Sequence, residues 1–313
     1  MPDHGSFAAL GYRYFLAVAE TGSVRAASRV LNVAASAISR QLILLEDQLG
    51  LVLFDRSGRH LTLSPAGEIL KDGLITAAHG HEDTLERLSA LRGLKRGRVR
   101  IATVESISVE VLPRLLMEFS ARFPGIEATI TVAGSDRVTE MVLNHEADVG
   151  FTFNPSSLDG LAIGASRDFQ IGAVLSPRHP LAEAKALTLA QCLDHAVAWP
   201  AQGLSLRTIL MRIPAARKIR PVYECNSLRL MAALAREGNC IAFQTIIGIG
   251  QELKAGTLRW IPLTDRRLPI DRFTMVHRKG QQGRPATNAF LETAAMHIFK
   301  AAPVRKNSTK RGR

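Results

Sequence analysis

Apolar residues near the N-terminus recur at intervals that predict two short amphipathic helices, separated by a tight break at Asn32 and Val33. In the second helix these residues are spaced by four, three and four positions, so we expect them to face the core. The apolar stripes are Val24, Ala27, Val30 and Leu31 in the first helix, and Ile38, Leu42, Leu45 and Leu49 in the second. This pattern is typical of a helix-turn-helix.

The outer face of the second predicted helix begins with short and polar side chains. A helix-turn-helix places the first residues of its second helix in the major groove of double-stranded DNA, where they meet the edges of the bases. We therefore expect DNA contacts from Ala35, Ser36, Ser39 and Arg40.

Residues 51–64 have alternating apolar positions around a turn at Ser57 and Gly58, which predicts a β-hairpin. Arg56 and Arg59 flank this turn. A charged hairpin taken alone is more often a solvated surface. Beside a helix-turn-helix, a charged hairpin is more often a wing that contacts the phosphates or the minor groove of DNA. Residues 1–64 are thus expected to form a winged DNA-binding domain.

A long helix is predicted over residues 65–94, with Ser64 as a cap and Pro65 in the first position. One face of it carries a stripe about five turns long, formed by Leu70, Leu74, Ala78, His81, Leu85 and Leu88. Such a stripe packs either on its own domain or against a second copy of the helix.

Beyond a short hinge, strand patterns at 98–104, 126–132 and 148–153 alternate with helix patterns near 109–123 and 136–146, which predicts a doubly wound sheet with crossover helices. A second alternating set runs from about residue 169 to residue 262. A strand at 270–278 and a helix near 286–301 are expected to return to the first set. The prediction is an α/β domain over 98–302, with lobe I at about 98–168 and 268–302 and lobe II at about 169–267.

The net charge of +12 is not evidence for DNA binding, because residues 1–97 hold 11 basic and 10 acidic side chains. Residues 300–313 alone carry six basic residues, and we expect 303–313 to be a disordered basic tail.

The three cysteines are far apart and lack metal-ligand spacing, so no metal site or disulfide framework is suggested. No apolar run approaches the roughly 18 residues of a membrane span, so we expect a cytoplasmic protein.

Residues 14–67, from YFLAVAETGS to LTLSPAG, resemble the N-terminal signature of LysR-type transcriptional regulators at nearly every position. The resemblance continues through LPRLLMEFSARFPGIEATI, NHEADVGF and SLRLMAALAREGNCIAF, and covers about Tyr12 to Phe299. It implies an α/β protein with an all-α winged helix-turn-helix, a long linker helix and a two-lobed effector domain like a type 2 periplasmic-binding protein. It favours dimerisation through the long helix, further assembly into a tetramer, and binding to an imperfect inverted repeat.

The same resemblance places an effector between the two lobes. Ser106 and Ser135 each follow a strand and stand where the family commonly has effector-binding hydroxyls, although a serine at such a place is often only a helix cap. Trp199 and Pro200 are expected to form a wall of the cavity, with core packing of Trp199 as the alternative. Because helix N-termini favour anions, the expected effector is a small carboxylate or a similar anion. The family pattern is broken at Ala34, Ala35, Cys240 and Gln244.

Taken together, these patterns predict a sequence-specific DNA-binding transcription regulator that responds to a small molecule and has no other cofactor. The alternative is a ligand-independent architectural DNA-binding protein, which would need no sensor domain. An enzyme is disfavoured, because the sequence lacks a GxSxG elbow, a P-loop, an HExxH pair and a dinucleotide-binding glycine pattern. RNA polymerase is a further possible partner.

Overall fold

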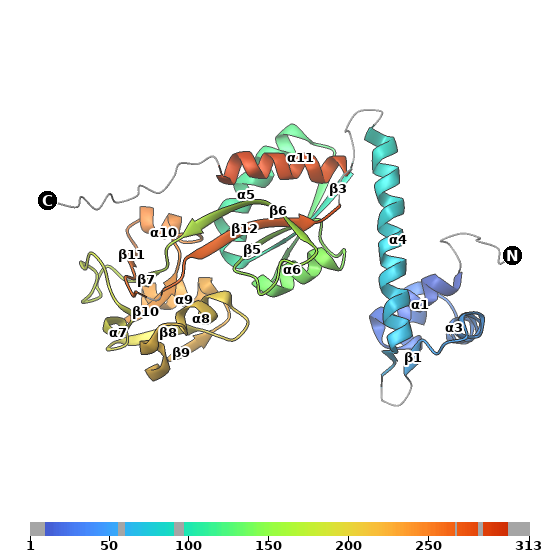
Figure 1. Cartoon of the computed structure of the whole chain (residues 1–313), viewed down its shortest axis with the longest axis horizontal. Coiled ribbons are helices and arrows are strands. Elements are labelled where there is room, and N and C mark those ends of the chain that lie inside the picture. Colours follow the sequence, from blue (N-terminus) through green and yellow to red (C-terminus); the bar gives the residue numbers. More distant parts are fainter. Residues whose placement is uncertain (1–9, 56–59, 91–96, 267, 281–283, 300–313) are drawn as a thin grey trace. The chain divides into compact units, whose positions relative to one another are not determined.

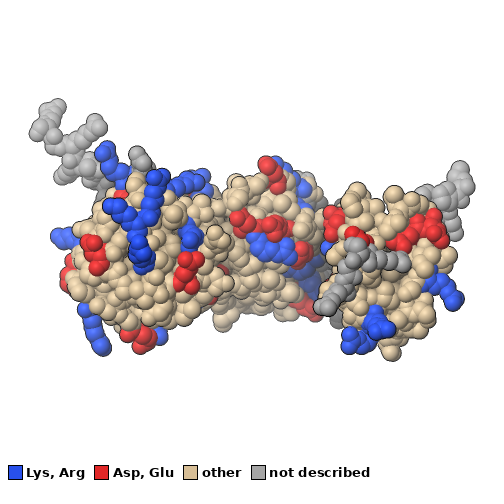
Figure 2. Space-filling view, turned by 90° about the horizontal axis from the view of Figure 1, so that it is seen from below, with Lys and Arg blue, Asp and Glu red and all other residues tan. Residues whose placement is uncertain are grey.

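The computed structural model describes residues 10–55, 60–90, 97–266, 268–280 and 284–299. The chain divides into two compact units, Met1–Leu85 and Glu86–Arg313. Both units mix basic and acidic side chains on the face shown in Figure 2. Within the described ranges, no helix is both long enough and apolar enough to cross a membrane.

The N-terminal unit is a small helical domain closed by a hairpin (Figure 1). Its core joins Phe15 and Val18 of the first helix to Ile38 and Leu42 of the third, and all four are almost fully buried. The elements are α1 (Leu10–Thr21), α2 (Val24–Leu31), α3 (Ala35–Leu49), β1 (Phe54–Asp55), β2 (Thr62–Leu63) and α4 (Pro65–Ala90).

The turn between α2 and α3 has the expected tight geometry. Asn32 adopts a left-handed conformation with φ 54°, and its backbone N–H closes α2 on the carbonyl of Ser28. Such a conformation is tolerated by asparagine and ends a helix within one residue. The predicted helix-turn-helix is therefore confirmed, but Val30 and Leu49 are not core residues. They are 71% and 41% exposed, because they lie past the edge of each buried stripe.

The beginning of α4 is anchored to its own unit. The hydroxyl of Ser64 accepts from Gly67 N at 3.0 Å and donates to the carbonyl of Val52 at 2.6 Å, as a cap should. Leu74 is buried and Leu70 half-buried in the helix-turn-helix core, so these two stripe residues are already covered within one chain. The helix is described as far as Ala90, short of the predicted end at residue 94.

The C-terminal unit contains two five-stranded sheets. The first has the strand order β4-β3-β5-β12-β6, in which β3 runs parallel to both β4 and β5, and β12 returns antiparallel from the end of the chain. Helices α5 and α11 pack together on one face of this sheet, and α6 lies on the other (Figure 1). The elements are β3 (Gly97–Thr103), α5 (Glu105–Arg122), β4 (Ile126–Val132), α6 (Ser135–Leu143), β5 (Val149–Phe153), β6 (Leu161–Phe169), β12 (Asp271–Arg278), α11 (Pro285–Ala294) and η2 (Ala295–Phe299).

The second sheet has the order β11-β7-β10-β8-β9 and its own apolar core. Its elements are β7 (Gly172–Leu175), α7 (Leu189–Cys192), β8 (Ala196–Pro200), α8 (Ser205–Leu210), η1 (Pro214–Lys218), β9 (Tyr223–Cys225), α9 (Leu228–Glu237), β10 (Cys240–Gln244), α10 (Gly250–Lys254) and β11 (Arg259–Pro262). The chain passes from the first sheet to the second after β6 and back before β12, so the predicted two-lobed α/β fold is confirmed. We call the lobe around the first sheet lobe I and the other lobe II.

Candidate functional site

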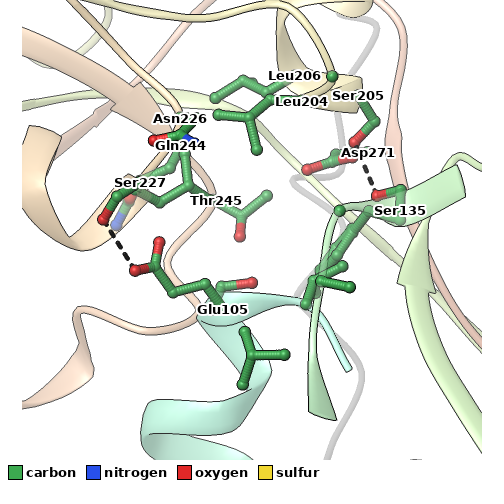
Figure 3. A pocket seen from close by; sticks show the side chains of 18 of the residues that line it. Glu105, Ser135, Leu204, Ser205, Leu206, Asn226, Ser227, Gln244, Thr245 and Asp271 are labelled. Atoms are coloured by element: carbon green, nitrogen blue, oxygen red, sulfur yellow. Dashed lines mark hydrogen bonds between the residues drawn. The ribbon is translucent and has the colours of Figure 1, made fainter. Parts of the chain in front are cut away.

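A cavity of about 460 Å³ lies where the two lobes meet (Figure 3). This volume is in the range of sites that hold a small molecule. Lobe I supplies the first turns of α5 and α6, which follow the C-terminal ends of the parallel strands β3 and β4. Lobe II supplies residues 202–206, residues 226–228, Gln244 and Thr245. This is the edge at which ligands of doubly wound sheets usually bind.

Both predicted effector-binding serines line this cavity. Ser106 is the second residue of α5 and Ser135 the first residue of α6, and they are 6% and 5% exposed. Neither is a helix cap, because the N-cap residues are Val104 and Gly134. The Ser135 hydroxyl lies 3.4 Å from the hydroxyl of Ser205, so it meets lobe II directly.

The predicted wall at Trp199 and Pro200 is wrong. Neither residue lines the cavity, and Trp199 is 1% exposed within the core of lobe II, where its ring packs edge-on against Phe243 at 5.6 Å between centroids. Both faces of β8 are covered within lobe II, with Val197 and Trp199 in one apolar cluster and Ala198 in the other, so no residue of this strand lines the cavity. The cavity wall is formed a few residues later, by Gln202 to Leu206.

Two glutamates at the start of α5 connect the lobes. Glu105 accepts hydrogen bonds from Ser227 Oγ at 2.8 Å and from Arg229 N at 3.3 Å, at the N-terminus of α9. Glu110 accepts from the backbone N–H groups of Gly248 and Gly250, at 3.1 and 3.0 Å. Each carboxylate thus receives backbone donors that would otherwise lack partners at the interface between lobes. Sequence reasoning missed both residues, because no local pattern marks a partner more than 100 positions away.

Asp271 is a further cavity residue that sequence reasoning did not assign to the site, and Gln244, one of the positions that break the family pattern, also lines the cavity. Burial raises the pKa of Asp271 to about 7, against an opposing hydrogen bond from Asn154. Gln244 is 3% exposed, and its amide oxygen has no hydrogen-bond partner within the described residues. Both side chains therefore carry polar atoms that can bond to a ligand.

The helix-turn-helix presents the predicted DNA-contacting side chains at the start of α3. Ser36 and Arg40 are exposed, and Ala35 and Ser39 are half-buried. Ala34 precedes the helix as an N-cap without a side-chain hydrogen bond, which leaves the first amides of α3 free for a phosphate. Arg56 and Arg59, the predicted wing residues, lie outside the described residues.

On α4, the side chains of Ala78, His81 and Leu88 are exposed, and the side chain of Leu85 lies outside the described residues.

Among the described residues, no group of three or more histidine, cysteine or acidic side chains is placed to hold a metal ion. Burial raises the pKa of Cys192 to about 12, so this thiol is a poor nucleophile.

Comparison with known proteins matches both units. A model for the bacterial regulatory helix-turn-helix of the lysR family matches residues 11–68, and a model for the LysR substrate binding domain matches residues 92–298. A RuBisCO operon transcriptional regulator of Allochromatium vinosum is 27% identical over 283 residues, which are 90% of this chain and 93% of that protein. A probable nitrogen assimilation transcriptional activator of Synechococcus elongatus is 30% identical and matches 72% of this chain and 75% of its own.

Solved structures agree on the fold. Full-length CbnR complexed with its target DNA has a TM-score of 0.63 at 22% identity, covering 94% of this chain and 100% of that one. A full-length OxyR variant from Pseudomonas aeruginosa has a TM-score of 0.66 at 15% identity, covering 94% and 96%. With a matching model on each unit, this chain belongs to the LysR family and is a transcription regulator that joins a DNA-binding helix-turn-helix to an effector-binding domain.

Proposed function

We propose that this regulator senses a small carboxylate, which binds in the cavity between the lobes and contacts the hydroxyls of Ser106 and Ser135. The observation that carries the proposal is the cavity itself, which has the volume of a small-molecule site and is lined by the first turns of α5 and α6. Gly134, the N-cap of α6, has no side chain to occupy the free amides of that helix. An anion there gains about 0.3 to 1 kcal/mol from the helix dipole.

Binding changes the regulator because the cavity joins two lobes. A ligand shifts a conformational equilibrium only if it prefers one arrangement. A ligand that touches Ser135 of lobe I and Ser205 of lobe II prefers the arrangement in which these two residues are close. The change in lobe geometry would then alter the spacing of two DNA-binding domains in one assembly.

The assembly that we propose is a homodimer through α4, joined further into a tetramer. Its support is the exposed part of the stripe, at Ala78, His81 and Leu88, which the helix-turn-helix core does not cover. A dimer would hold two copies of α3 about 34 Å apart, one turn of DNA, and would read an imperfect inverted repeat. Contact with RNA polymerase is part of the same proposal.

The test is a calorimetric screen of aliphatic and aromatic carboxylates against the full-length protein. We expect a ligand whose affinity falls about tenfold or more in Ser106→Ala and Ser135→Ala. Ser108→Ala is the matched control, because Ser108 lies on the same turn of α5, donates to the carbonyl of Glu105 and does not line the cavity. A ligand that binds all four proteins equally would place the effector site elsewhere.

A further inference from the structure

Asp271 is a buried carboxyl without a cationic partner among the described residues. It begins β12 at the floor of the cavity and is 7% exposed. One of its oxygens, Oδ1, accepts from Asn154 Nδ2 at 2.6 Å, which is a neutral donor. The next residue, Arg272, turns away and pairs with Asp168 at 2.7 Å. A carboxylate in such a place is costly unless it gains a donor or a positive charge.

The charged side chains that line the cavity are acidic. They are Glu105 and Asp271, and none of the described residues that line the cavity is a lysine, arginine or histidine. Figure 3 shows Asp271 beside Ser135 and Ser205, with Glu105, Ser227 and Gln244 on the other side of the cavity. A ligand whose only charge is negative would meet two carboxyl groups and no cation. A positively charged group on the ligand would balance the charge of these carboxyl groups.

The neutral side chains of the lining suit the same kind of ligand. Gln244 is nearly fully buried, its amide oxygen has no partner in the described part of the chain, and Thr245 follows it in the lining. An amide can present either its oxygen or its nitrogen, and a hydroxyl can donate or accept. These groups can therefore bond to other polar atoms of the ligand, while Ser135 and the N-terminus of α6 receive a carboxylate.

We propose that the effector carries a protonated amine as well as a carboxylate, and that Asp271 binds the amine. The effector class is then a zwitterionic amino acid rather than a simple carboxylic acid. This inference rests on the proposed function, because it assumes that the ligand occupies the cavity between the lobes. Asp271 is the specificity-determining residue, since its carboxylate pairs with the ammonium group and rejects the deaminated analogue.

The proposal predicts that ligand binding changes the number of protons bound to the protein. Burial holds the pKa of Asp271 at about 7, so part of the population is protonated at neutral pH. An ammonium group lowers that pKa, and the protein releases protons on binding. An anion in the same place would raise it, and the protein would take protons up. Charged groups on the surrounding elements are the Asp168–Arg272 pair, Arg167 over the Phe169 ring, Asp136 with Ser156, and Glu105 with Ser227.

The experiment uses the full-length protein and two sets of probes, the twenty protein amino acids and the carboxylic acids that lack their α-amino groups. Affinities are measured by calorimetry at pH 7 in two buffers with different ionisation heats. We expect at least one amino acid to bind ten times more tightly than its deaminated analogue, with proton release. Asp271→Asn should abolish this preference, whereas Glu127→Gln, an exposed carboxylate that pairs with Arg98, should keep it.

Several outcomes would overturn the proposal. If a carboxylic acid without an amine binds as tightly as the amino acid and Ser135→Ala weakens it, the cavity is the effector site but the amine is not required. Proton uptake on binding to the wild type would also contradict it, whether or not Asp271→Asn folds. If no probe of either set binds, both this inference and the carboxylate effector fail.

Discussion

Gly248 of lobe II lies directly against Ser106 of lobe I. A Cβ atom added to Gly248 would come within 3.0 Å of both the Cα and the backbone oxygen of Ser106. The predicted effector-binding serine is therefore held in place by the opposite lobe. A change at this contact should affect both stability and ligand binding.

Gly248→Ala should destabilise the protein more than Gly256→Ala does. Both glycines have positive φ, 87° and 69°, so both substitutions strain the backbone, but a Cβ on Gly256 meets no atom within 4 Å. The difference should be about 1 to 3 kcal/mol, the usual cost of overpacking. Denaturant unfolding of both variants measures it. Equal losses would mean that the lobes do not touch at this point.

The buried carboxylate of Asp148 should make lobe I sensitive to acid. It is fully buried and bonds to the side chains of Arg100 at 2.9 Å and Arg284 at 2.6 Å. Burial acts to raise its pKa, but the hydrogen bonds and charges of the two arginines outweigh burial and hold the pKa below the ordinary value of 3.8. The stabilisation is therefore complete above that ordinary pKa and is lost as the pH falls through the lower, native one.

Asp148→Asn should cost about 3 to 5 kcal/mol, because it leaves two arginines without their buried partner. Glu127→Gln, which removes an exposed pair with Arg98, should cost about 1 kcal/mol or less. Thermal unfolding at pH 3 to 7 compares them. A wild-type stability that does not fall in acid, or an Asp148→Asn variant as stable as the control, would argue against this role.

Leu88→Glu should produce monomers that still fold. Leu88 is 57% exposed on the stripe of α4, so a charge there disturbs only a partner helix. Ile69→Glu is the control, on the same helix and 75% exposed but off the stripe. Light scattering gives the mass of each variant. The buried Leu74 is unsuitable for this test, because Leu74→Glu should unfold the helix-turn-helix core itself. If Leu88→Glu is still a dimer, Leu88 does not lie in the dimer interface.

Arg40→Ala should weaken DNA binding and lower the slope of log affinity against log salt by about one, if its guanidinium meets a phosphate. Arg56→Ala is expected to do the same from the wing. A base-reading contact would instead relax preference at one position of the site, at a cost of about 1 to 3 kcal/mol. Arg98→Ala, an exposed arginine of the other unit, serves as the control. A salt titration indistinguishable from wild type would exclude the residue as a contact.

The secondary structure was largely predictable because its signals are local. The strands at 98–104 and 126–132 were expected from the alternation of strand and helix patterns, and β3 and β4 lie within one residue of those bounds. The helix after β3 was expected near residue 109 but begins at Glu105. Pro113 lies inside this helix, and the β-branched residues before it favour a strand, so the local pattern concealed its first turn.

Only part of the cavity lining was predictable from the sequence. Ser106 and Ser135 could be placed because each follows a strand and matches a family position. Glu105 meets Ser227 across 122 positions, and Asp271 reaches the floor of the cavity only because β12 returns to lobe I. Such contacts depend on the topology of the whole domain. Trp199 was misplaced for a related reason, since the sequence alone does not tell that both faces of β8 are covered within lobe II.

The most direct test of the account is a footprint on the DNA upstream of the gene for this protein, with and without the cavity ligand at saturation. The account predicts that the ligand changes the length or spacing of the protected region for the wild type, and that the same concentration leaves the footprint of Ser135→Ala unchanged. An identical wild-type footprint with and without a ligand known to occupy the cavity would contradict it.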